Sequence, residues 1–152
     1  MNKLLIFLFS IFLIYSCGSS RPSSGRTSSG TLDFGSPNVK QVVLDNDLFL
    51  IEHVTTDSTY AFTAENPVMV GSHSPAEQRR FLNSIAGPEG QSLKYERLGS
   101  CCGFYTENGM FGNAGLLDMY EVDYKGLKNS VVMYISFYDS DTLKIPVGFT
   151  LK

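Results

Sequence analysis

Two segments of alternating polarity near the C-terminus constrain the fold of this chain more than any other feature. Residues 116–124 place Tyr120, Val122 and Tyr124 on one side, and residues 130–138 place an apolar or aromatic side chain at every second position from Val131 to Phe137. A period of two is typical of β-strands that bury one face. The connection over residues 125–129 is short and contains Gly126, which favours a hairpin. The sequence therefore predicts a central hairpin over residues 116–138.

One clear helix signal lies upstream of this hairpin. Ser74 is a favourable N-cap, a proline occupies the first helical position, and Glu77 completes the pattern of a capping box. An apolar stripe that includes Phe81 follows, and Gly87 with the proline after it ends the pattern. We expect one main helix over residues 75–86.

Several shorter segments are rich in β-branched and aromatic residues. They predict further strands, at residues 42–44, 48–54, 60–62, 68–70 and 93–98. Runs of strands with one helix, without regular βαβ alternation, are typical of α+β folds. We therefore expect an α+β domain with a mostly antiparallel sheet.

The N-terminus has the pattern of a secretory signal. Lys3 precedes an apolar segment, residues 4–15, that is too short to span a bilayer. Residues 14–18 read IYSCG and resemble the lipobox of bacterial lipoproteins. The resemblance implies cleavage after a signal peptide of residues 1–16, a diacylglycerol thioether on Cys17 and acylation of the new N-terminus. An ordinary signal peptide with a chance cysteine is the alternative.

A polar tether separates this anchor from the predicted domain. Residues 18–30 contain six serines and three glycines, a composition that cannot bury enough apolar surface to fold. As a random coil such a segment spans about 20 Å. We assign residues 17–35 to the lipidated cysteine and its tether, and residues 36–152 to a single globular domain.

Anchor and charge together predict a compartment and partners. Two or more acyl chains hold a protein at the membrane without spanning it, so we expect a lipid-anchored protein of the bacterial cell envelope. Gly18 stands where aspartate retains some lipoproteins in the inner membrane, and this resemblance favours the outer membrane, on its periplasmic or surface face. Expected partners are membrane lipid through Cys17 and an envelope protein or ligand. Loss of Lys3 leaves 15 acidic side chains against the remaining basic ones, a net charge of −4 without a basic patch, which argues against nucleic acid.

Few other residues match known chemistry. His53 and His73 are the only histidines, and their wide separation does not fit the usual spacing of zinc ligands. The acidic pairs within residues 45–47 and 139–141 lack the remaining ligands of an EF-hand. The three glycines of a G-x-x-G-x-x-G pattern, residues 109–115, lead into a strand and predict a flexible loop instead of a phosphate site. We expect no catalytic residue, cofactor or metal site.

Cys101 and Cys102 form the remaining candidate site. Free thiols rarely persist in an oxidising envelope, but neighbouring Cα atoms lie only about 3.8 Å apart, below the usual span of a disulfide. A regular strand would also direct the two side chains to opposite faces, whereas Gly99 and Gly103 permit a turn. Three states are open to this possible redox pair: a vicinal disulfide, buried free thiols, or a bond to another molecule or a metal.

Six further segments carry a resemblance to a known family. They read NPVMVG at 66–71, RRFLN at 79–83, GPEG at 87–90, YERLGSCC at 95–102, LLDMYEV at 116–122 and PVGF at 146–149. With them the chain is similar to a family of small lipoproteins of the Bacteroidota, over nearly the whole mature domain. Some members of that family carry the label 2-dehydro-3-deoxyphosphooctonate aldolase. The synthase of that name resembles a (β/α)₈ barrel of about 250 residues, roughly twice the length of this domain.

These observations lead to two hypotheses about function. The first is a non-enzymatic, membrane-anchored envelope lipoprotein that acts as a binding or structural module. The alternative is an envelope enzyme, either thiol-based through Cys101 and Cys102 or of the aldolase type named above. We favour the first hypothesis, because the sequence contains no recognisable catalytic constellation.

Overall fold

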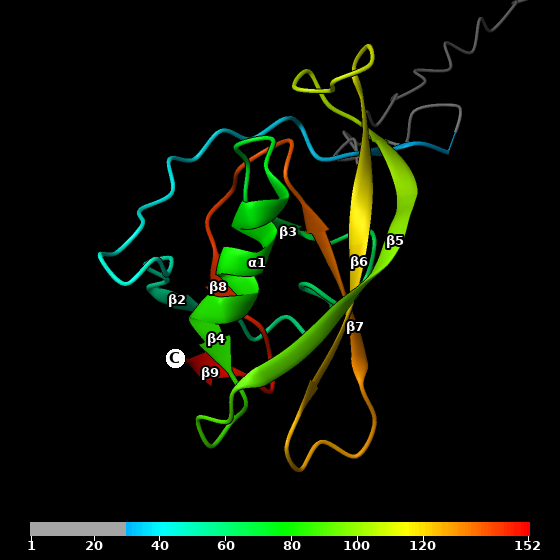
Figure 1. Ribbon diagram of the computed structural model, residues 1–152. Coiled ribbons are helices and arrows are strands. Elements are labelled where there is room, and N and C mark those ends of the chain that lie inside the picture. Colours follow the sequence, from blue (N-terminus) through cyan, green and yellow to red (C-terminus); the bar gives the residue numbers. More distant parts are fainter. Residues whose placement is uncertain (1–29) are drawn as a thin grey trace, which may run out of the picture.

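A curled, mixed five-stranded sheet is the framework of the structure, a computed structural model that describes residues 30–152 (Figure 1). The predicted signal peptide, Cys17 and the tether up to residue 29 lie outside the described residues. In spatial order the strands are β1 (Leu32–Asp33), β5 (Leu93–Tyr105), β6 (Ala114–Tyr124), β7 (Val131–Ser136) and β3 (Val68–Met69). The central pairs are antiparallel, and the two short edge strands pair in parallel. The predicted α+β class and mostly antiparallel sheet are confirmed.

The predicted central hairpin is formed by β6 and β7, which pair from Asp118 and Ile135 to Val122 and Val131. The longer ribbon, however, is β5–β6. We expected β5 to stop near Leu98, because the glycines after it indicated an interruption. Instead the strand continues through two irregularities of register, one between Arg97 and Gly99 and one after Cys101. β-Bulges add a residue without ending a strand, and they bend it.

Helix α1 spans Pro75–Ser84 and begins as predicted at Ser74. The Ser74 hydroxyl accepts a hydrogen bond from the backbone N–H of Ala76 at 3.2 Å. Glu77 does not close a capping box with it, because its carboxylate pairs with Arg80 on the next turn. The cap thus uses one side-chain bond where the sequence suggested two.

Two short ladders complete the architecture. The helix stops two residues before its predicted end, since Ile85–Ala86 form β4 and pair with β9, Thr150–Leu151. Strand β2, His53–Val54, pairs with β8, Lys144–Ile145. The prediction of a strand at residues 60–62 is wrong: this segment forms turns.

The turn at this position has a backbone cause. Ala61 takes a positive φ of 72°, a left-handed conformation that no regular strand contains. The N–H of Phe62 donates back to the carbonyl of Thr59 at 2.9 Å, which closes the turn. The predicted strands at 42–44 and 48–54 likewise reduce to a bridge between Val43 and Phe49, and to β2.

The core lies between the inner face of the curled sheet, α1 and the short ladders. Gln78 on the helix is fully buried, donates to the carbonyl of Ile135 at 3.1 Å and accepts from the Tyr120 hydroxyl at 2.9 Å. These bonds hold α1 against the middle of the sheet. The largest fully buried apolar side chains are Phe49, Phe81, Phe104, Leu82, Ile85, Leu117, Met133 and Ile135.

The β5–β6 ribbon separates two ends of the molecule (Figure 1). At one end is the loop that joins β5 to β6, residues 106–113, which we call the tip; the described chain begins beside this end, where β1 pairs with Phe104 and Tyr105. At the other end lie the start of β5 and the connection from β6 to β7, residues 125–130. Strand β5 keeps these ends about 30 Å apart. Among residues 30–152 no helix has the length and apolar character needed to cross a membrane.

Candidate functional site

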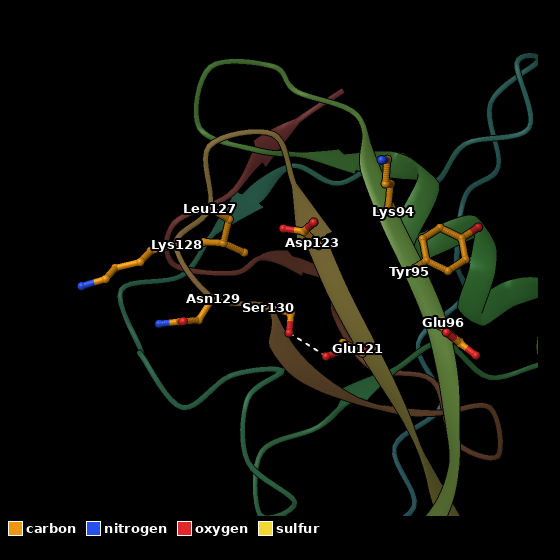
Figure 2. A pocket seen from close by; sticks show the side chains of 9 residues that line it. All are labelled: Lys94, Tyr95, Glu96, Glu121, Asp123, Leu127, Lys128, Asn129 and Ser130. Atoms are coloured by element: carbon orange, nitrogen blue, oxygen red, sulfur yellow. Dashed lines mark hydrogen bonds between the residues drawn. The ribbon is translucent and has the colours of Figure 1, made fainter.

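A polar pocket of about 520 Å³ lies at the end of the ribbon away from the tip, and we call it the sheet pocket (Figure 2). Three elements supply its walls: the start of β5, the end of β6 and the connection to β7. The lining residues are Lys94, Tyr95, Glu96, Glu121, Asp123, Leu127, Lys128, Asn129 and Ser130. Its size is that of a small-ligand site, but its walls carry more charge than the mostly apolar walls of typical drug-sized pockets.

Strand register determines which charges meet in the sheet pocket. Lys94 lies directly opposite Asp123, a favourable cross-strand pair. Glu96 lies directly opposite Glu121, and like charges in that position destabilise a sheet. The hydroxyl of Ser130 donates to the Glu121 carboxylate at 2.6 Å, the bond drawn in Figure 2. Sheet stability therefore does not account for the two facing glutamates.

The sheet pocket presents both donors and acceptors to a ligand. Lys128 and Asn129 project outward from the connection between β6 and β7, while the Asp123 carboxylate projects from β6 (Figure 2). The Tyr95 ring packs against the core, and its phenol donates to Asn83 on α1 at 3.0 Å, so Tyr95 anchors β5 behind the pocket. This arrangement is suited to a hydrophilic ligand with several hydrogen-bonding groups.

Cys101 and Cys102 are joined by a disulfide in the structure, with Cα atoms 3.8 Å apart. Both residues are half-buried, and they lie where the register of β5 shifts for the second time. Cys102 has a φ of 55°, which is uncommon for any residue except glycine. This left-handed residue breaks the alternation of the strand, so the two side chains need not point to opposite faces.

A buried carboxylate lies beside the first irregularity of β5. Asp118 is 3% exposed and accepts hydrogen bonds from Arg97 and from the hydroxyl of Ser100, each at 2.7 Å. The hydrogen bond to Asp118 raises the pKa of the Arg97 guanidinium above its ordinary value. No sequence motif marks this cluster. The sequence feature that indicates the cluster is Asp118, an acidic residue on the same strand face as Tyr120.

A second polar cluster fastens the base of the tip. Asp139 is 1% exposed, and its Oδ1 accepts from the Thr106 hydroxyl at 2.6 Å and from the Asn108 amide at 2.7 Å. Its Oδ2 is buried without a hydrogen-bond partner among the described residues. The His73 imidazole contacts the Asn108 carbonyl at 2.7 Å through Nε2 and packs edge-on against Tyr138.

The other residues considered from the sequence are spread over the molecule. His53 lies on β2, as its strand pattern suggested, and His73 lies just before α1. Within residues 30–152 no three His, Cys, Asp or Glu side chains gather as metal ligands. Cys17 lies outside the described residues. The structure thus brings together charged residues that no motif had marked, because strand pairing assembles them.

Comparison of the chain with protein-family models, with curated proteins and with solved structures found no match.

Proposed function

We propose that this chain is a lipid-anchored lipoprotein of the bacterial cell envelope that acts as a non-enzymatic binding module. In this proposal Cys17 carries the lipid, the polar residues after it form the tether, and the sheet pocket takes a hydrophilic partner or ligand. The outer membrane is the proposed location.

The observation that carries the binding role is the sheet pocket itself. It is an open concavity with carboxylates, ammonium groups, an amide and a hydroxyl in its walls. Two of the carboxylates belong to Glu96 and Glu121, which are register partners across β5 and β6, a placement of like charges that does not favour the sheet. Residues that work against local stability are typical of functional sites.

The position of the sheet pocket supports the proposal further. The described chain begins at the opposite end of the β5–β6 ribbon, beside Phe104 and Tyr105. A tether that leads from this end to the membrane leaves the pocket about 30 Å farther out. A binding site in that place is open to soluble ligands and to other envelope proteins.

Metabolic labelling tests the anchor. Cells that express the full chain are fed an alkyne fatty acid, and the purified protein is coupled to a fluorescent azide. We expect label on the wild-type chain and none on Cys17→Ala. Equal label on the two chains contradicts lipidation at Cys17.

Site-specific photocrosslinking tests the binding role. A photoreactive phenylalanine analogue replaces Asn129 at the rim of the sheet pocket. The matched control carries the analogue at Glu52, an exposed position immediately before β2. We expect a discrete crosslinked species from Asn129 in intact cells. Identical patterns at both positions contradict a specific role for the pocket.

The vicinal cysteines favour a second candidate, an envelope thiol enzyme. Disulfide exchange requires a thiolate that attacks and a sulfur that can be reached, and both cysteines are half-buried. Oxidation of a dithiol substrate to its disulfide, with a small-molecule disulfide added to reoxidise Cys101 and Cys102, would support this candidate if it is lost in Cys101→Ser. Full pocket crosslinking without any thiol turnover would favour the binding module.

A further inference from the structure

The tip is a folded loop that holds two large apolar side chains in water. Phe111 is 86% exposed and Met110 is 55% exposed. Transfer of an exposed phenylalanine side chain out of water is favourable in free energy. Exposed apolar groups that lie together mark surfaces that contact a membrane or another molecule.

Glycine and backbone hydrogen bonds give this loop a closed shape. A side chain at Gly109 would meet the backbone of Ala114 at 2.4 Å, so only glycine allows the close return of the loop. The N–H of Thr106 donates to the carbonyl of Asn113 at 3.2 Å, and the N–H of Gly109 donates to the carbonyl of Thr106. Met110 and Phe111 are therefore held exposed within a closed turn.

The chain enters the fold next to this loop. Strand β1 pairs with Phe104 and Tyr105, immediately before the tip. The Phe34 ring packs against the Phe104 ring at 5.2 Å, and the hydroxyl of Ser36 accepts from the N–H of Glu107 at 3.0 Å. The entering segment is thus fastened to the base of the tip by backbone, aromatic and side-chain contacts.

The length of the tether matches the position of the tip. Thirteen residues, 18–30, lie between Cys17 and Thr31. A random coil of thirteen residues spans about 20 Å. From Phe104, where β1 begins to pair, two residue steps lead to Thr106 at the base of the tip, a distance of roughly 7 Å. A lipid on Cys17 can therefore reach the same membrane plane as Phe111.

The strands that lead to the tip carry further apolar surface. Tyr105 is 37% exposed and Leu116 is 49% exposed. Tyrosine places an apolar ring and a polar hydroxyl at the boundary between lipid and water, where aromatic residues are enriched. Glu107 is the one charged residue of the tip, which favours a zwitterionic surface over an anionic one.

We propose that the tip inserts Phe111 and Met110 into the interfacial region of the phospholipid bilayer that carries the lipid anchor. This inference rests on the proposed lipoprotein function. Insertion at the tip gives the domain two points of attachment, so the ribbon stands on the membrane and the sheet pocket is directed away from it.

The chain contains no tryptophan, so Phe111→Trp introduces a single fluorophore at the tip. The lipidated full chain is reconstituted in vesicles of phosphatidylethanolamine and phosphatidylcholine. We expect the tryptophan of Phe111→Trp to emit at shorter wavelength in the vesicles than in buffer without vesicles. Lipids brominated in the acyl chains should quench this tryptophan several-fold more strongly than the tryptophan of the control variant. The control is Val54→Trp, a position that is 71% exposed on β2 and away from the tip.

Each result has one meaning for the tip. Emission from Phe111→Trp that stays at the aqueous wavelength overturns the inference. A shift to shorter wavelength without quenching by brominated lipid also overturns it, because the ring then packs against protein, a second copy or another partner. Absence of alkyne label on the same preparation contradicts the anchor alone, while lipid quenching at residue 111 without label still supports the tip.

Discussion

The two ends of the β5–β6 ribbon differ in almost every physical property. The tip end exposes apolar side chains, Met110 and Phe111, on a loop closed by glycine and fastened to a buried carboxylate. The pocket end exposes charged side chains of both signs, with Leu127 only half-buried among them. One continuous ribbon thus supports an apolar surface and a hydrophilic one, which suggests that the two ends meet different environments.

The tip end depends on packing, and this gives the largest expected effect. Phe104 is 1% exposed and its ring contacts Phe34 and Tyr138. Replacing it by alanine should lower the free energy of unfolding by about 3–5 kcal/mol, because the transfer free energy of the ring is lost and the cavity left behind adds a further cost. Urea unfolding measures the change.

The matched substitution at the pocket end is Leu127→Ala. Its side chain is half-buried, so the expected loss is clearly smaller. Equal losses at the two positions would break the contrast between a packed tip end and a solvated pocket end.

The middle of the ribbon should respond to the loss of a buried charge. Asp118→Asn keeps the shape of the side chain but removes the charge that Arg97 and Ser100 contact. We expect a loss of about 1–3 kcal/mol, discounted from a fully buried pair because the Arg97 side chain is 48% exposed.

Asp123→Asn is the control for this change, since Asp123 is exposed at the pocket end. Its effect should stay within about 0.5 kcal/mol in the same chemical unfolding experiment. If Asp118→Asn is as mild as the control, the Arg97 cluster contributes nothing to the sheet.

The disulfide should act locally at the tip end. A bridge between adjacent residues closes almost no chain, so its loss removes little entropy from the unfolded state. For Cys101→Ser combined with Cys102→Ser we expect a change of less than about 1 kcal/mol in global stability. Amide hydrogen exchange should accelerate in residues 99–106 and stay constant in residues 118–124.

A global loss much larger than this would show that the bulge organises the whole sheet. Uniform exchange along the ribbon would in turn remove the distinction between its two ends. Reduction of the wild-type chain with a dithiol provides the matched comparison without any substitution.

The smallest expected effect tests the charges of the sheet pocket. Glu96→Lys turns the facing pair Glu96 and Glu121 into an attractive one, and should stabilise the protein by about 0.2–1 kcal/mol. Added salt should shrink this gain, because both groups are exposed. The reverse change at the neighbouring pair, Lys94→Glu, should destabilise by a similar amount.

Thermal unfolding at low and high ionic strength reads out both variants. Destabilisation by Glu96→Lys would mean that the two glutamates do not repel each other across the strands. A gain in stability combined with loss of the Asn129 crosslink would connect the charges of the pocket to binding.

Local patterns in the sequence were sufficient for the elements that depend on neighbouring residues. Ser74 and Phe81 predict α1 to within two residues, and the alternation over 116–138 predicts β6, β7 and their hairpin. Both predictions succeed because the periodic placement of apolar residues in a helix or a strand is visible within one short segment of the sequence. The turn at residues 60–62 was missed, because its apolar composition is that of a strand while its backbone is left-handed at Ala61.

Tertiary structure alone decided the sites. The sheet pocket exists because β5 lies against β6 in one register, which brings Glu96 opposite Glu121. The tip lies beside the chain entry because β1 pairs with the end of β5, at residues more than seventy positions away. Composition determines which segments prefer strands, but hydrogen bonds between distant segments and the bulges at Arg97 and Cys101 select the register. A shift of one residue would turn every side chain to the other face, so the pocket could be found only once that register was known.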